Sequence, residues 1–210
     1  MKLIHNFKSP NFNDRKSNNI EIIVIHYTAL SSISNSLKYL CSKKNKVSSH
    51  YLISQSGKIY SLVSEKKRAW HAGQSYWRGN TDINSISIGI ELDFSPSDIN
   101  NKFTLKLNFA LIFLLKKLLK KYSISTENIL GHSDIAPYRK IDPGKNFPWQ
   151  MLESKKLSYR LQLINRSDIN NNLTKEWFEM NKFNSIKKKI LFMLNFIGYD
   201  ISLAIKNKIY

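Results

Sequence analysis

The eight residues IEIIVIHY, positions 20–27, constrain the fold more than any other stretch of the chain. Five of them are isoleucine or valine, whose branched side chains favour extended backbone. An apolar run of this length without polar alternation is typical of a strand buried on both faces. We therefore expect the chain to fold around a sheet with this strand in its middle. His26 lies near the end of the strand, where open sheets commonly present functional groups.

The segment GHSDIAPYRKIDPGKNFPW, residues 131–149, holds His132, Lys140 and Asp142. Its glycines and prolines predict an irregular loop, and the proline after Asp142 biases that residue toward an extended backbone. Imidazole and carboxylate groups suit zinc, and a nearby lysine can stabilise developing negative charge. Together with His26 the loop would supply three ligands, and a catalytic zinc keeps its fourth position for water. Structural roles are the alternative: histidines that only pack, and an aspartate that caps the following turn.

Other segments of the chain carry the patterns of helices and strands. Apolar residues at helical spacing predict helices near 33–45 and over 103–122, the second with trailing lysines that suit the negative end of the helix dipole. Two β-rich runs joined by Gln-Ser-Gly predict a hairpin over 48–63. Residues 85–94 and 127–130 are expected to form further strands.

The composition is strongly basic, with 33 Lys and Arg against 15 Asp and Glu and a formal net charge of +18. Such a field favours polyanions. However, no helix-turn-helix pattern and no basic motif with interleaved aromatic residues is present, so we predict solvated lysine faces and no dedicated nucleic-acid site. The single cysteine, Cys41, excludes an internal disulfide. No apolar run reaches the length of a transmembrane segment.

Five short segments occur in a characteristic order: IVIHYTA (23–29), SSHYLIS (48–54), AWHAG (69–73), SISIGIEL (85–92) and GHSDIAPYRKIDPG (131–144). They resemble the zinc-dependent N-acetylmuramoyl-L-alanine amidases of the AmpD and AmiD type, which are related to phage lysozyme-amidases and peptidoglycan recognition proteins. The resemblance covers roughly residues 18–150. It implies an α/β fold, with a mixed central β-sheet flanked by helices and a groove over Zn²⁺. The implied activity is hydrolysis of the amide bond between N-acetylmuramic acid and L-alanine in peptidoglycan or muropeptides.

The resemblance also implies roles for individual residues. Its metal ligands match His26, His132 and Asp142. Glu91 matches the general base and acid, and Lys140 matches the lysine that stabilises the oxyanion. A carboxylate inside a strand is costly unless it has a function or a partner. A solvated glutamate, or Asp93 in a shifted strand register, is the alternative to a catalytic Glu91.

Substrate contacts are expected beside the groove, in the loop after the hairpin and just before the strand at 85–94. Aromatic rings stack on sugars, and arginine pairs with carboxylates such as those of a stem peptide. The candidate substrate-binding residues are Trp70, His71, Trp77, Arg78 and Asn84. A loop that is anchored by burying its own tryptophans is the alternative. His50 is expected to be a scaffold histidine.

We expect three parts: an extended N-terminal arm (1–19), the zinc amidase domain (20–155), and a linker with a helical C-terminal extension (156–210). In the extension, residues 175–202 show helical periodicity that ends at Gly198. This part resembles a fragment of a peptidoglycan-binding module, and a helix packed back on the amidase domain is the alternative.

The alternative function is a non-catalytic peptidoglycan-binding protein. Such relatives typically lose a metal ligand, whereas all three are present here, which favours the enzyme. We expect a monomer. No signal peptide is visible, which predicts a cytoplasmic protein. The AmiD-like residues of the HYT and SSHYL segments, and the C-terminal helix, instead favour the periplasm or cell envelope.

Overall fold

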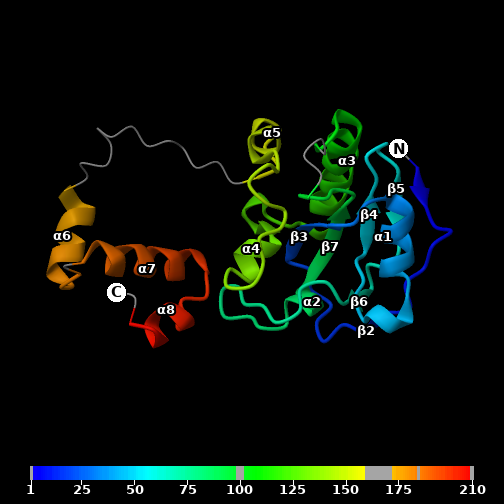
Figure 1. The fold of residues 1–210 in the computed structure, drawn as a ribbon. Helices are drawn as coiled ribbons and strands as arrows, with labels where there is room; N and C mark the ends of the chain where they lie inside the picture. Colours follow the sequence, from blue (N-terminus) through cyan, green and yellow to red (C-terminus); the bar gives the residue numbers. More distant parts are fainter. Residues whose placement is uncertain (1, 98–101, 159–171, 184, 209–210) are drawn as a thin grey trace.

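The computed structural model describes residues 2–97, 102–158, 172–183 and 185–208 (Figure 1). Its centre is a six-stranded sheet. In spatial order the strands are β1 (Leu3–Ile4), β5 (Ile59–Ser61), β4 (Tyr51–Ile53), β7 (Ser87–Leu92), β3 (Ile22–Tyr27) and β8 (Ile129–Gly131). Strands β4, β7, β3 and β8 are parallel, whereas β5 runs antiparallel to β4 and parallel to β1. This mixed sheet, with helices on both faces, confirms the predicted fold class.

The strand predicted from IEIIVIHY is β3, and it lies between β7 and β8 as the run of branched residues required. Ile23, Val24 and Ile25 are fully buried. Alternate residues of the strand point to opposite faces of the sheet. In the register of β3 with β7, His26 lies directly beside Glu91.

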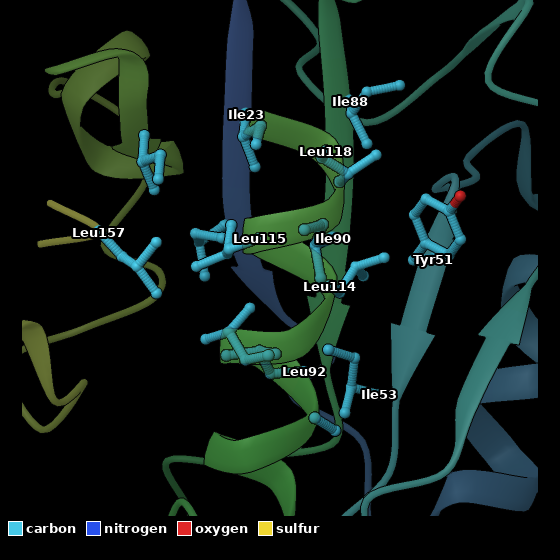
Figure 2. Close-up of a cluster of buried hydrophobic side chains, with 14 of the residues drawn as sticks. Ile23, Tyr51, Ile53, Ile88, Ile90, Leu92, Leu114, Leu115, Leu118 and Leu157 are labelled. Atoms are coloured by element: carbon cyan, nitrogen blue, oxygen red, sulfur yellow. The ribbon is translucent and has the colours of Figure 1, made fainter. Parts of the chain in front are cut away.

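One face of the sheet is covered by α3 (Leu105–Tyr122), close to the predicted helix (Figure 2). The Thr104 side chain caps the first turn by accepting a hydrogen bond from Leu107 N, and Ser123 ends the helix in the left-handed region. Its buried leucines pack against apolar side chains of β3 and β7; the cluster includes Leu111, Leu114, Leu115, Leu118, Ile23, Ile25, Ile88, Ile90 and Leu92. Each fully buried leucine contributes about 2 kcal/mol to stability, so this layer stabilises the sheet beneath the site.

The opposite face carries α1 (Ile33–Leu40), α2 (Ile83–Ile86) and α4 (His132–Ile135). Ile22 and Val24 point to this face and belong to a second apolar cluster with Trp77, Ile83, Leu130 and Ile135. His26 and Glu91 follow the same alternation, so their side chains lie on this face as well. The predicted hairpin is formed by β4 and β5.

The N-terminal residues are extended, as expected of an arm, but they also pair with the domain. Strand β1 adds to the edge of the main sheet, and β2 (Phe12–Asp14) pairs antiparallel with β6 (Lys67–Ala69). The side chain of Arg15 donates to the carbonyls of Glu65, Asn84, Ser85 and Ser87. This first segment is therefore built into the folded unit.

After α5 (Trp149–Ser154) the described chain resumes with α6 (Asn172–Met180), α7 (Ile186–Ile197) and α8 (Ser202–Lys206). The periodicity predicted over 175–202 is thus divided between helices, and α7 ends at Gly198 as expected. Rings of Trp177, Phe178, Phe183 and Phe192 pack together in this extension. Residues 159–171 of the expected linker lie outside the described residues. Among the described helices, none has the length and apolar character needed to cross a bilayer.

Candidate metal centre

Three side chains from separate elements meet at the edge of the sheet where the parallel strands end. His26 is the penultimate residue of β3, His132 opens α4 directly after β8, and Asp142 lies in the loop that follows α4. Because β8 is the neighbour of β3, the end of one strand delivers His132 beside the end of the other. All three residues are buried, and one ligand atom from each lies within 4.8 Å of the others.

The donor atoms of this triad point at a common position. The two Nδ1 atoms of His26 and His132 are 2.9 Å apart, and each lies 3.1 Å from Oδ2 of Asp142. Nε2 of His132 lies 3.1 Å from the carbonyl oxygen of Ala72, which can only accept, so the His132 proton sits on Nε2 and its Nδ1 carries a free lone pair.

The electrostatics of the triad favour a cation. Burial and the neighbouring His132 lower the pKa of His26 to about 4. Burial alone would raise the pKa of Asp142, but its contacts with both imidazoles hold it well below its usual range. A carboxylate oxygen and two imidazole lone pairs repel one another when they face each other at about 3 Å. A positive ion bound between them would remove this repulsion. Two nitrogens and one oxygen form a donor set that fits a divalent metal such as zinc.

Glu91 is the acidic group next to this triad, on the strand adjacent to His26. It is 8% exposed, and its Oε2 is among the buried polar atoms of the described residues that have no hydrogen-bond partner. Burial, followed by the charge of Asp142, raises the pKa of Glu91 to about 8. Lys140, which is half-buried in the loop after α4, acts in the opposite direction through its positive charge.

Asp93, the alternative acid, lies just past the end of β7. It accepts a hydrogen bond from Gln55 N at 3.4 Å, and burial raises its pKa. The register observed for β7 places Glu91, and not Asp93, opposite His26. The carboxyl group beside the triad is therefore that of Glu91.

The structure divides the five candidate substrate residues into different surroundings. Trp70 is partly exposed, and its indole donates to the Asn13 side chain at 2.9 Å. His71 is buried against the triad, with its Nδ1 3.1 Å from Nε2 of His26. Asn84 is also buried, and its side-chain oxygen accepts from two backbone N–H groups at 2.8 and 3.0 Å. Both ring nitrogens of His71 and the side-chain oxygen of Asn84 therefore have partners within the protein.

Trp77 and Arg78 contact the C-terminal extension. Trp77 is 4% exposed and packs edge-on against Tyr199. The guanidinium and backbone N–H of Arg78 donate to the carbonyls of Ile197 and Gly198, both at 3.0 Å. These contacts agree with the alternative of an anchored loop, and substrate binding by Trp77 and Arg78 stays a prediction.

One residue near the site had not been identified from the sequence. The guanidinium of Arg139 donates to the carbonyls of Ala72 and Gln74, and it lies 3.4 Å from Nε2 of His132. It ties the loop after β6 to the loop after α4. The scarcity of arginine beside lysine was an available signal, because a planar guanidinium bridges several carbonyls where a lysine cannot.

Known proteins give an independent comparison. Residues 16–145 match the N-acetylmuramoyl-L-alanine amidase family (Amidase_2). The N-acetylmuramoyl-L-alanine amidase AmiD of Escherichia coli (strain K12) is 43% identical over 155 residues, which are 63% of this chain and 52% of that protein. The 1,6-anhydro-N-acetylmuramyl-L-alanine amidase AmpD of Haemophilus influenzae is 42% identical over 106 residues, or 50% of this chain and 56% of that protein.

Solved structures agree with this result. The complex of E. coli AmiD with anhydro-N-acetylmuramic acid-L-Ala-D-gamma-Glu-L-Lys matches with a TM-score of 0.71 and 33% identity, covering 90% of this chain and 76% of that chain. An AmpD structure matches with a TM-score of 0.63 and 28% identity, covering 75% of this chain and 94% of that one. The chain spans about half the length of the curated relatives it matches. With its match extending over more than half of its residues, the chain belongs to the N-acetylmuramoyl-L-alanine amidase family.

Proposed function

We propose that this chain hydrolyses the amide bond between N-acetylmuramic acid and L-alanine in peptidoglycan or muropeptides, with Zn²⁺ held by His26, His132 and Asp142. The observation that carries the proposal is the convergence of three buried donor atoms beside a buried carboxyl group without a hydrogen-bond partner. Names of relatives support the substrate class, since they are amidases of muramyl-L-alanine linkages.

An amide resists hydrolysis because its carbonyl is a poor electrophile and its amine a poor leaving group. A metal ion held by the triad would polarise the carbonyl and lower the pKa of water to about 7. The protein adds a group that moves protons: the Glu91 carboxyl, with a pKa raised to about 8, is suited to accept a proton and return it near neutral pH. It would take the proton of the attacking water and deliver it to the departing amino group of L-alanine.

Lys140 would supply a positive charge near the reacting atoms. Its ammonium group acts on both Glu91 and His26, which indicates that its field reaches the reacting region. A positive charge held there stabilises the negative oxygen that develops when the carbonyl is attacked. Lys140→Ala is expected to lower turnover and leave metal binding close to that of the parent.

The experiment combines metal analysis with product identification. His132→Ala should lose zinc and muropeptide cleavage together, whereas Glu91→Gln should keep zinc and lose cleavage. Mass spectrometry of products from intact sacculi and from anhydro-muropeptides, with and without chelator, identifies the bond cut and the preferred substrate. Undiminished turnover by His132→Ala would refute the role of the triad. Binding of muropeptides without cleavage by the zinc-loaded parent would favour a recognition protein instead.

A further inference from the structure

We infer that the dipeptide His71–Ala72, held in place by Asn84, orients both imidazole ligands of the metal centre. The inference rests on the proposed metal site and assigns positioning roles to two residues that the sequence had suggested for substrate binding. It follows from hydrogen bonds on the sides of His26 and His132 that face away from the metal position.

His71 acts on His26 through a chain of hydrogen bonds whose direction is fixed at its far end. The hydroxyl of Ser87 lies 2.6 Å from the carbonyl oxygen of Ile83, which can only accept, so Ser87 donates there. Nε2 of His71 lies 3.1 Å from the same hydroxyl and must be the donor to it. The unprotonated Nδ1 of His71 then accepts from Nε2–H of His26 at 3.1 Å. As a result, Nδ1 of His26 is left free to bind a cation.

The carbonyl group of Ala72 fixes the proton position of the second imidazole, His132. Its carbonyl oxygen accepts from Nε2–H of His132 at 3.1 Å, which leaves Nδ1 of His132 free and turned toward the same position. Two successive residues thus provide the acceptors for two ligands that are 106 positions apart in the sequence. A single shift of this dipeptide would turn both rings.

Asn84 and Gly89 fix the dipeptide itself. The Asn84 side-chain oxygen accepts from the backbone N–H of His71 at 3.0 Å and of Ala72 at 2.8 Å. Gly89 on β7 lets the His71 ring lie directly on the sheet, since a Cβ at that position would approach Cγ of the ring to 2.4 Å. The ring is therefore held by its backbone, by the sheet beneath it and by both of its nitrogens.

Acceptors of this kind set the tautomer and orientation of a ligating histidine and raise its basicity, and their loss typically costs 10–100-fold in metal affinity. A residue that only fills space would leave metal affinity unchanged when replaced by a group of similar size. The two roles are therefore separated by a binding measurement, without reference to turnover.

The experiment measures Zn²⁺ affinity by competition with a chromophoric chelator, together with the visible spectrum of the Co²⁺-loaded protein. His71→Phe keeps a ring but removes the acceptor, and we expect Zn²⁺ binding to weaken by roughly 10–100-fold with an altered Co²⁺ spectrum. His71→Asn, whose side-chain oxygen can take the place of Nδ1, should recover most of the affinity. Asn84→Leu should weaken binding in the same direction, and Asn84→Asp, which keeps the acceptor, should weaken it less.

His50→Phe is the matched control, because His50 is a fully buried imidazole with no metal ligand among its hydrogen-bond partners. Its Nδ1 accepts from Gly89 N–H, and its Nε2 contacts the Lys67 carbonyl and the Arg15 guanidinium. It should lower stability but keep the zinc affinity of the parent. Parental zinc affinity in both His71→Phe and Asn84→Leu, or an equal loss in His50→Phe, would overturn the inference. If the parent itself binds neither Zn²⁺ nor Co²⁺, the proposed function fails instead.

Discussion

Replacing Glu91 by Gln should stabilise the metal-free protein and abolish the activity of the zinc-loaded protein. The folded-state pKa of Glu91, about 8, lies above the ordinary value of 4.5, so the folded protein holds this proton more tightly than the unfolded chain. Its favourable contribution is complete below about pH 4.5 and is lost as the pH rises to about 8. At about 1.4 kcal/mol per pH unit, ionisation opposes folding by about 3 kcal/mol at pH 7. Glutamine resembles the neutral acid and avoids this cost.

The assay is urea denaturation of chelator-treated parent and variant between pH 4 and pH 8. The free energy of unfolding of Glu91→Gln should equal that of the parent near pH 4 and exceed it increasingly above, by up to about 3 kcal/mol at pH 7. Glu21→Gln is the control, because Glu21 is exposed directly before β3 and should show no such trend. A difference that stays flat with pH, or that favours the parent as pH rises, would refute the buried-acid reasoning.

Three further variants test the supports of the site by chemical denaturation. Leu115→Ala removes a fully buried side chain between α3 and the sheet and should cost about 2–5 kcal/mol; a smaller loss would contradict the packing described for that layer. Gly89→Ala places a Cβ against the His71 ring and should cost about 1–3 kcal/mol and weaken zinc binding, so a neutral effect would show that the ring is not confined there. Tyr199→Phe removes the 2.6 Å hydrogen bond to Asp134 and should cost about 1 kcal/mol, whereas no change would mean that the extension is not fastened by this bond.

The positions of the candidate ligands show which structural features local sequence patterns predict. An uninterrupted run of branched residues predicts a strand wherever it occurs, because burial on both faces excludes polar alternation. The position of His26 at the end of that strand followed from the sequence. Glycine and proline in the segment around His132 and Asp142 predicted irregular backbone, although the structure also forms the short helix α4 there.

The substrate-binding predictions depend on contacts that local sequence patterns do not reveal. Trp77 and Arg78 are an aromatic and a cation next to each other, which is equally typical of a sugar-binding loop and of a packed interface. Their contacts with Ile197 and Tyr199 support the second possibility, and those partners are more than 100 residues away in the chain. Spacing within a loop carries no information about such distant partners.

What the sequence determined by itself was the central strand, the covering helix and the identity of residues suited to bind a metal, because these depend on side-chain chemistry and on neighbours within a few positions. Only the tertiary structure decided that β8, β3 and β7 lie side by side, so that His132, His26 and Glu91 share one edge. It also decided that His71 and Asn84 face the ligands and the backbone. Hydrogen-bond partners of buried groups are chosen by how distant segments pack, and a linear pattern does not encode that choice.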